Sequence, residues 1–220
     1  MTGNPVGQIV PYRALLGIST NAEGGEARSS FAIVRTGGYA DYGFGGFIYE
    51  RNGDVVLPTT GQATFSGDYS GMRVFNGITG MEYTTGDMTI DIDFDDFNAN
   101  DAVKGNVTNR VAFEIDGATI ELGQAADDEL ELPDLNFVIV EGTPSLTANG
   151  ELSGSVRSGV LDESGGVEEY ETGTYYGVIA GDMTNPSDGG EIVGIIVVES
   201  EDPRYDGVSV QETGGFILYR

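Results

Sequence analysis

The sequence predicts an all-β protein, an eight-stranded antiparallel β-barrel preceded by a small N-terminal β segment. From Gly61 to Arg220, short runs that alternate apolar and polar residues are separated by turn residues, as in a β-meander that closes on itself. The chain contains 35 glycines, about twice the usual share of ~7%, and glycines inside small barrels mark bends and close backbone contacts. No segment resembles a long amphipathic helix, which disfavours a parallel α/β fold.

The first 58 residues are predicted to form the small β segment, which we call the handle. Three short strands are expected at residues 14–18, 29–34 and 43–49, separated by turns that contain glycine. The handle is expected to accompany the barrel rather than to fold alone, because so short a segment buries little apolar surface.

Residues 59–220 are predicted to form the barrel. Residues 62–75 alternate, with Phe65 and Tyr69 on one side. The clearest period of two runs from Met88 to Asp95, with Met88, Ile90, Ile92 and Phe94 inward and Thr89, Asp91, Asp93 and Asp95 outward. The other expected strands are residues 103–115, 118–122, 137–140, 145–156, 169–180, 191–199 and 208–219, with a helical turn within 125–132. Eight or nine strands suit a barrel that is filled by side chains or holds one small ligand.

Two of these strands are apolar on both faces, residues 175–180 and 192–198. Either the handle covers their outer side, or that side is a contact surface. Coverage is the favoured interpretation, because large apolar areas are usually buried.

The formal charge of −26 limits the possible partners. A chain with 36 acidic and 10 basic residues repels phosphate, so binding to nucleic acid or to anionic membranes is disfavoured. The expected partner is neutral, cationic or a patch on a protein. No apolar run approaches the ~20 residues of a membrane-spanning helix, and residues 1–4 lack the features of a signal peptide.

The chain contains neither histidine nor cysteine. This composition excludes a Ser-His-Asp triad, an imidazole base, a cysteine nucleophile, histidine- or thiolate-bound zinc and a histidine haem ligand. We therefore expect a non-enzymatic protein with no catalytic residues and no cofactor. An enzyme that relies on carboxylates alone is the remaining catalytic alternative.

Two acidic clusters are candidate cation sites. Asp91, Asp93, Asp95 and Asp96 place carboxylates on one strand face, but without a loop to gather them a solvated outer face is favoured over calcium binding. The oxygen-rich segment 182–191 contains ordinary turn formers, and a turn is favoured there. No metal site is predicted.

Glu171-Thr172-Gly173 and Glu212-Thr213-Gly214 are similar to the Asp-Thr-Gly loops of aspartic proteases, in which two carboxylates share a proton. The extra methylene of glutamate and the short chain argue against that activity. Glycines at strand entries are the favoured explanation.

The segment 37–47 is the candidate binding loop. It places Tyr39, Tyr42, Phe44 and Phe47 on a backbone rich in glycine, and rigid rings on a permissive loop are typical of recognition surfaces. Tyr39 and Tyr42 are expected to be the exposed pair. The alternative for Phe44 and Phe47 is that they plug an end of the barrel.

Several segments resemble one family. Residues 57–71, with Gly61, Ala63, Gly67 and Gly71, are similar to the G-x-A-x-Y-x-G-x-x-x-G barrel-entry strand of transferrin-binding protein B-like surface lipoproteins. Residues 88–97, residues 147–156, the pair 173–177 and 191–194, and the ending 214–220 resemble later strands of that family.

This resemblance implies an eight-stranded barrel beside a β handle, anchored by a lipid on the outer surface of Gram-negative bacteria rather than spanning the membrane. It also implies binding of a host or nutrient molecule, including iron- or haem-related ones, with an outer-membrane transporter as a possible partner. Because this chain lacks lysine-rich loops, transferrin itself is not the expected ligand.

Together these observations predict a surface-exposed or secreted solute-binding protein that captures a protein or small nutrient through its loops. The alternative is a structural or adhesive acidic surface module with no small-molecule ligand.

Overall fold

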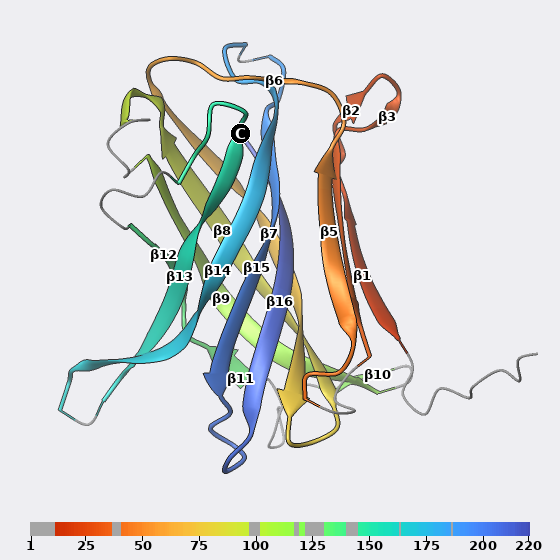
Figure 1. Cartoon of the computed structure of the whole chain (residues 1–220), viewed down its shortest axis with the longest axis vertical. Coiled ribbons are helices and arrows are strands. Elements are labelled where there is room, and N and C mark those ends of the chain that lie inside the picture. The colour runs from red at the N-terminus through yellow and green to blue at the C-terminus, as the bar shows by residue number, and fades with distance from the viewer. Residues whose placement is uncertain are drawn as a thin grey trace, which may run out of the picture.

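The computed structural model describes residues 12–36, 41–96, 102–116, 119–121, 130–139, 145–162, 164–185 and 187–220. It confirms the predicted fold class, because these residues are almost all in strands and eight strands close into an antiparallel barrel (Figure 1). In chain order they are β7 (Gln62–Asn76), β8 (Met81–Asp93), β9 (Val103–Asp116), β12 (Leu135–Val138), β13 (Glu151–Leu161), β14 (Val167–Asp182), β15 (Glu191–Glu201) and β16 (Ser209–Tyr219). Each pairs with the next, and β16 pairs with β7 to close the ring.

The handle contains a three-stranded antiparallel sheet that stands beside the barrel (Figure 1). Its strands are β1 (Arg13–Ile18), β4 (Ser29–Arg35) and β5 (Gly45–Arg51), with β4 in the middle. A short hairpin of β2 (Ala22–Glu23) and β3 (Glu26–Ala27) lies between β1 and β4 in the chain. Before the barrel begins, β6 (Val55–Val56) pairs in parallel with the end of β14.

Three short elements border the barrel. The 3-10 helix η1 (Phe94–Asp96) follows β8, and both β10 (Thr119–Glu121) and β11 (Leu130–Leu132) pair with β9. The helical turn expected within residues 125–132 is therefore wrong at its end, because residues 130–132 pair with residues 110–112 of β9. Residues 125–129 lie outside the described part of the chain.

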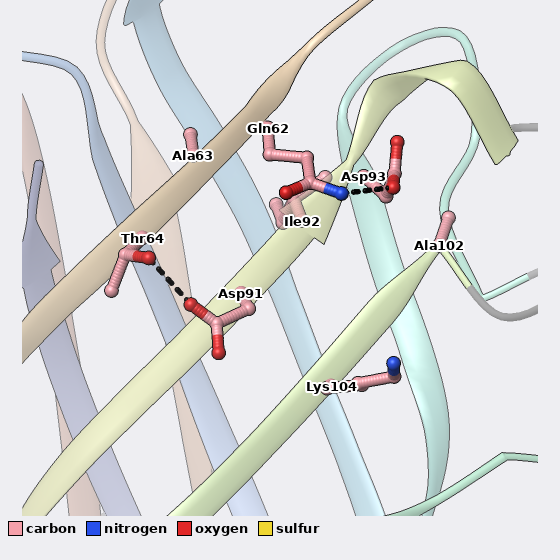
Figure 2. A pocket seen from close by; sticks show the side chains of 8 residues that line it. All are labelled: Gln62, Ala63, Thr64, Asp91, Ile92, Asp93, Ala102 and Lys104. Atoms are coloured by element: carbon pink, nitrogen blue, oxygen red, sulfur yellow. Dashed lines mark hydrogen bonds between the residues drawn. The ribbon is translucent and has the colours of Figure 1, made fainter.

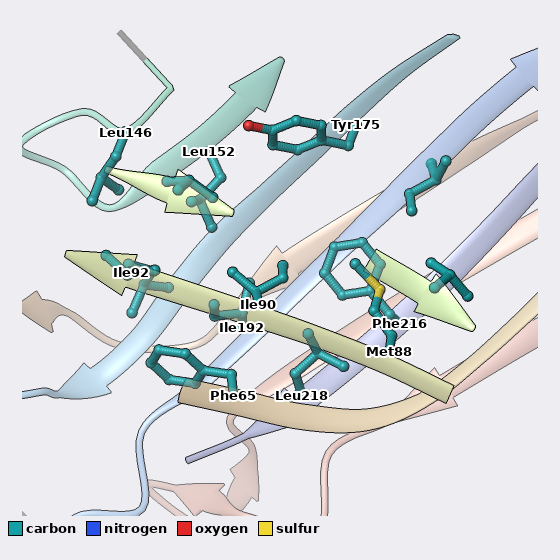
Figure 3. Close-up of a cluster of buried hydrophobic side chains, with 14 of the residues drawn as sticks. Phe65, Met88, Ile90, Ile92, Leu146, Leu152, Tyr175, Ile192, Phe216 and Leu218 are labelled. Atoms are coloured by element: carbon teal, nitrogen blue, oxygen red, sulfur yellow. The ribbon is translucent and has the colours of Figure 1, made fainter. Parts of the chain in front are cut away.

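One end of the barrel interior is an apolar core (Figure 3). The alternation predicted for β8 is confirmed, because Met88, Ile90 and Ile92 are each 1% exposed whereas Asp91 lies at the surface. Side chains from all eight barrel strands meet there, so the interior is filled. Burial of a large aliphatic or aromatic side chain contributes about 1.5–3 kcal/mol, and this core is the main stabilising element of the barrel.

Strand β15 is apolar on both faces because each face contacts a different layer. Ile192 and Ile196 point into the barrel core, whereas Val193 and Ile195 pack outward in a cluster with Phe31 of β4. Coverage by the handle, the favoured alternative for residues 192–198, is therefore correct.

Two adjacent glycines in β16 allow aromatic rings to approach this strand from both sides. A methyl group on Gly214 would overlap the ring of Tyr69 inside the barrel, and one on Gly215 would overlap the ring of Phe31 from the handle. Only a residue without a Cβ fits between these layers. Gly215 thus defines how closely the handle packs on the barrel, and Gly214 defines how closely Tyr69 packs on β16 from inside.

Arginines attach the handle to the barrel near the ends of its sheet. Arg28, Arg35 and Arg51 each reach across to barrel segments. The partners are the carbonyl (2.8 Å) and carboxylate (3.1 Å) of Asp188, the side chains of Gln211 and Thr213, and the carbonyls of Asn149 (2.8 Å) and Ile179 (2.7 Å).

The segment 182–191 also serves this attachment. Asp182 accepts hydrogen bonds from Thr184, as in an ordinary turn, and Glu191 is buried, where its carboxylate accepts from the hydroxyls of Ser19 (2.7 Å) and Ser29 (2.5 Å). The acidic residues of this loop therefore fix the handle in place.

Candidate functional site

The loop between β4 and β5 contains the four aromatic residues predicted to bind a ligand. Tyr39 lies outside the described residues. Phe44 is 64% exposed and Phe47 is 37% exposed, so neither plugs the barrel. Tyr42 was expected to be exposed but is half-buried, since its hydroxyl donates a hydrogen bond to Ser209 Oγ at the start of β16 (2.9 Å). Phe44 is thus the most accessible of the three described rings.

The outer face of the handle sheet is mostly apolar; its polar residues in this register are Ser30 and Glu50, which hydrogen-bond to each other. Leu16, Ala32 and Ile48 form one row across β1, β4 and β5. Leu16 and Ile48 are each 64% exposed, and Ile18 is 59% exposed. Because side chains alternate between the faces of a sheet, the residues that pack on the barrel leave this second face to solvent. We call Leu16, Ile18, Ala32, Val34 and Ile48 the outer patch.

The charge of the molecule is distributed very unevenly. Residues 1–56 contain five acidic and four basic side chains, whereas residues 57–220 contain 31 acidic and six basic ones. The handle is therefore almost neutral and the barrel carries nearly all of the negative charge. An apolar, nearly neutral face beside a strongly acidic body is a surface on which contact with another molecule costs little desolvation of charge.

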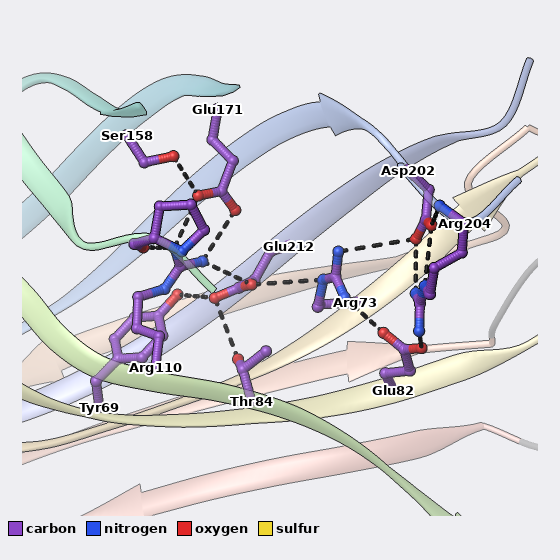
Figure 4. Close-up of polar contacts among 11 residues, drawn as sticks. Tyr69, Arg73, Glu82, Thr84, Arg110, Ser158, Glu171, Asp202, Arg204 and Glu212 are labelled. Carbon is purple, nitrogen blue, oxygen red and sulfur yellow. Dashed lines mark hydrogen bonds and ion pairs between the residues drawn. The ribbon is translucent and has the colours of Figure 1, made fainter. Parts of the chain in front are cut away.

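The second end of the barrel interior contains a network of buried ion pairs (Figure 4). Arg110 of β9 binds both oxygens of Glu171 on β14 (2.7 and 3.0 Å) and one oxygen of Glu212 on β16 (2.9 Å). Tyr69 and Thr84 donate to the other oxygen of Glu212 (2.6 and 3.1 Å). These contacts join β7, β8, β9, β14 and β16 through side chains.

The network continues toward the loop between β15 and β16. Arg73 of β7 binds Glu82 of β8 (2.6 Å), and Arg204 binds both Glu82 and Asp202 (2.6 Å each). Arg73 is fully buried, and its Nε and Nη2 atoms have no hydrogen-bond partner among the described residues. They lie 3.7 Å from Glu212 and 3.9 Å from Asp202, respectively. Arg73 thus links the two halves of the network through charge.

Charge controls the protonation of these groups. Burial alone would raise the pKa of Glu212, but Arg110, Arg73 and the Tyr69 hydroxyl hold this pKa below its ordinary value. Burial would likewise raise the pKa of Asp202, and its contacts with Arg204 lower it. Burial and the neighbouring Glu212 raise the pKa of the Tyr69 phenol well above its usual value. Glu212 and Asp202 are therefore ionised at neutral pH, and the Tyr69 phenol is protonated.

A pH titration of Glu212→Gln against the wild type tests this assignment. A carboxyl group with a lowered pKa in the folded state contributes stability above its unfolded-state pKa of about 4.3 and loses it as the pH falls through the folded-state value. We expect the variant to be less stable by about 2 kcal/mol or more at pH 7 and the difference to shrink below pH 4. Urea unfolding at several pH values measures it, and a difference independent of pH contradicts the assignment.

The two Glu-Thr-Gly segments do come together, but not as a protease dyad. Glu171 and Glu212 meet on Arg110, which binds both of them, and they are 2% and 1% exposed. A dyad requires two carboxylates that share one proton and face a substrate cleft. The arrangement found here instead joins strands.

The acidic cluster on β8 borders a surface pocket of about 350 Å³ that also contains Lys104 (Figure 2). Thr64 donates to Asp91, and Gln62 donates to Asp93 (2.5 Å each). Lys104 stands opposite Asp91 in the strand register. Within the described ranges, no group of three acidic residues is arranged to hold a metal ion. These carboxylates thus pair with the neighbouring strands.

Sequence reasoning missed most of the outer patch. The signal that could have found it is in residues 14–18, which are apolar at successive positions rather than at alternate ones. Such a strand has two apolar faces, and in a three-stranded sheet beside a barrel only one of them can be covered. The inward position of Arg73 could also have been found from the sequence. Every second residue of this strand points into the barrel, and Arg73 falls in the same alternating series as Phe65 and Tyr69.

No helix in the part of the chain that the structure describes is long and apolar enough to cross a membrane. No protein-family model matches the sequence, and no curated protein matches it.

Proposed function

We propose that this chain is a non-enzymatic binding protein that contacts a protein partner through the outer patch and the exposed ring of Phe44. The observation that carries the proposal is the exposure of Leu16 and Ile48, 64% each, on one face of a sheet whose other face is buried. Contiguous apolar surface of this kind marks interaction sites in soluble proteins. The exposure of these side chains favours a protein over a small molecule, because small-molecule sites are concave and enclose most of the ligand.

The barrel supports this role as a rigid base. Its interior is filled by an apolar core at one end and by ion pairs at the other, and the handle is fixed to it by three arginines. A contact surface held in one orientation loses little conformational entropy on binding. The similarity of the sequence to surface lipoproteins extends the proposal to a location outside the cell or on its outer membrane, with an outer-membrane transporter as a candidate partner.

Charge substitutions in the outer patch test the proposal. Leu16→Asp and Ile48→Asp should each weaken binding to the partner about tenfold or more, because an unpaired charge would be buried in the contact. The matched control is Leu161→Asp, since Leu161 is 76% exposed but lies at the tip of the β13–β14 hairpin, away from the handle (Figure 1). Partners retained from an outer-membrane extract on each immobilised protein are identified, and their dissociation constants are measured.

The outcomes separate the two candidate functions. Equal retention of one partner by all variants would place the contact elsewhere on the molecule. If even the wild type shows no saturable partner, the acidic structural or adhesive module becomes the better explanation.

A further inference from the structure

Strand β1 lies at the edge of the handle sheet, and no strand in the described part of the chain pairs with its other side, which we call the open edge. Ser19 donates its backbone N–H to Ser29 (2.9 Å), so it forms a hydrogen-bonded pair with β4. Such pairs alternate along an antiparallel ladder, which places the backbone groups of Leu15 and Gly17 toward β4 and those of Ala14, Leu16 and Ile18 away from it. No described residue outside the strand ladder makes a hydrogen bond to these three backbones. Among the described residues, these three outward-facing backbones have no pairing strand, so they are positions at which another chain could pair.

A groove runs along this open edge. A cavity of about 340 Å³ lies between β1 and the outer surface of β7 and β16. Phe31 and Ile217 contribute an apolar floor, and β7 contributes Gly67, Asp68 and Ser70 as a wall of small or acidic residues. A strand added beside β1 would thus have backbone partners on one side and a surface beneath it.

The wall of the groove has an uncompensated negative charge. Asp68 on β7 stands directly opposite Asp87 on β8, and both side chains are exposed. Like charges at directly opposed positions destabilise a sheet. Asp87 accepts a hydrogen bond from Asn109 (2.7 Å), but no ion pair joins either carboxylate to a cation in the described ranges. A basic side chain from outside would relieve this repulsion.

We infer that the groove accepts an extended segment of the partner protein, with alternating basic and apolar residues, as a fourth strand of the handle sheet. Its backbone pairs with Ala14, Leu16 and Ile18. Its basic residues face the barrel, where their methylene stems cross the apolar floor and their charges reach Asp68 and Asp87. Its apolar residues face outward and continue the row formed by Leu16 and Ile48.

This inference rests on the proposed function, because it describes how the partner meets the same sheet. A second copy of the chain fits the groove less well. Its own β1 has one basic residue, Arg13, followed by five apolar ones, and two molecules of charge −26 repel each other.

The test uses a capped synthetic peptide, Lys-Val repeated four times, and the complete protein in about 150 mM salt, which limits non-specific attraction. Two further peptides carry N-methyl groups on the valines or on the lysines, with unchanged charge. In an antiparallel added strand the valine N–H groups pair with β1, and in a parallel one the lysine N–H groups do. We expect one methylated peptide, but not the other, to lose at least tenfold in affinity.

Amide hydrogen exchange gives the location. The unmodified peptide should slow exchange at Leu16 and Ile18 at least tenfold. Equal binding of all three peptides would mean attraction by charge alone and would overturn the inference. Three other results would also overturn it. The peptide could fail to bind at millimolar concentration, or it could slow exchange at strands other than β1. The free protein could also form a dimer in which the Leu16 and Ile18 amides are already protected from exchange.

Protein variants separate this inference from the proposed function. Asp68→Asn should reduce peptide affinity and yet raise the melting temperature slightly, because it removes a like-charge pair; Asp134→Asn, an exposed carboxylate on another strand connection, should change neither. Ile48→Asp lies on β5, two strands from the open edge, and should weaken the whole partner while the peptide still binds. If Ile48→Asp fails to bind the partner and the peptide test also fails, the proposed function would be supported, but the added-strand contact would be ruled out.

Discussion

Replacement of Arg110 by methionine should lower the free energy of unfolding by about 3–5 kcal/mol, because it leaves two buried carboxyl groups, Glu171 and Glu212, without their main partner. Arg110 makes three hydrogen bonds to Glu171 and Glu212 and one to the carbonyl of Pro133 (2.6 Å). A domain of this kind has a total stability of about 5–15 kcal/mol, so the variant should be close to unfolding at room temperature. Urea denaturation followed by circular dichroism measures the change.

Further variants test whether the loss comes from the carboxyl groups left without a partner. Arg157→Met removes an arginine at the barrel surface and should change stability by less than about 0.5 kcal/mol. Glu171→Gln and Glu212→Gln, added to Arg110→Met, should recover part of the loss, because neutral amides are less costly to bury than charges. A loss below about 1 kcal/mol for Arg110→Met alone would mean that the network contributes little.

Replacement of Gly215 by valine should separate the handle from the barrel. The new side chain would occupy the space of the Phe31 ring, and overpacking of this kind costs about 1–3 kcal/mol. The damage should concentrate at the contact between Phe31, Ile33 and Val193, so hydrogen exchange in β4 should accelerate much more than exchange in β8. Ser66→Val is the control, since residue 66 is exposed on the outside of β7.

A double substitution makes this prediction specific. In a Phe31→Ala background the space occupied by the ring is empty, and Gly215→Val should cost less than it does in the wild type. Additive effects of the two substitutions would show that valine disturbs β16 by some means other than contact with Phe31.

The barrel could be predicted because its strands obey a period of two. In β8 the inward residues Met88, Ile90 and Ile92 are all apolar, and their burial matches the pattern. The double apolar character of Ile192–Val198 was equally informative, since it favoured a cover for the outer face of β15, and the handle provides that cover.

The ion-pair network could not be predicted from such patterns. In β9 the inward residues Val103 and Val107 have odd numbers, whereas Arg110, which is also buried inside, has an even number. A regular strand would point Arg110 outward. The register between β8 and β9 shifts near Asn109, which has a positive φ of 52°. A bulge of this kind reverses the faces of the residues that follow it, and nothing in the local sequence marks its position. For the same reason Glu171 and Glu212 were recognised as a pair of similar segments, but their shared partner was not.

The aromatic loop shows a different limit. Exposure of Tyr42 was expected from its neighbours in the chain, yet its hydroxyl finds Ser209, 167 residues away in the sequence. A partner at that separation depends on how the handle lies against the barrel, which is set by packing at Phe31 and Gly215.

The uneven placement of acidic residues has a consequence for how the molecule approaches its surroundings. With five acidic and four basic residues before position 57 and 31 acidic and six basic after it, the molecule is an electric dipole whose negative pole is the cylinder. Near any anionic surface, the field pushes this pole away from the surface and turns the nearly uncharged handle toward it. Diffusing molecules would therefore arrive at the surface in a preferred orientation before any contact forms. At about 0.1–0.15 M salt the field is screened beyond about 8–10 Å, so the orienting effect would act only within that distance.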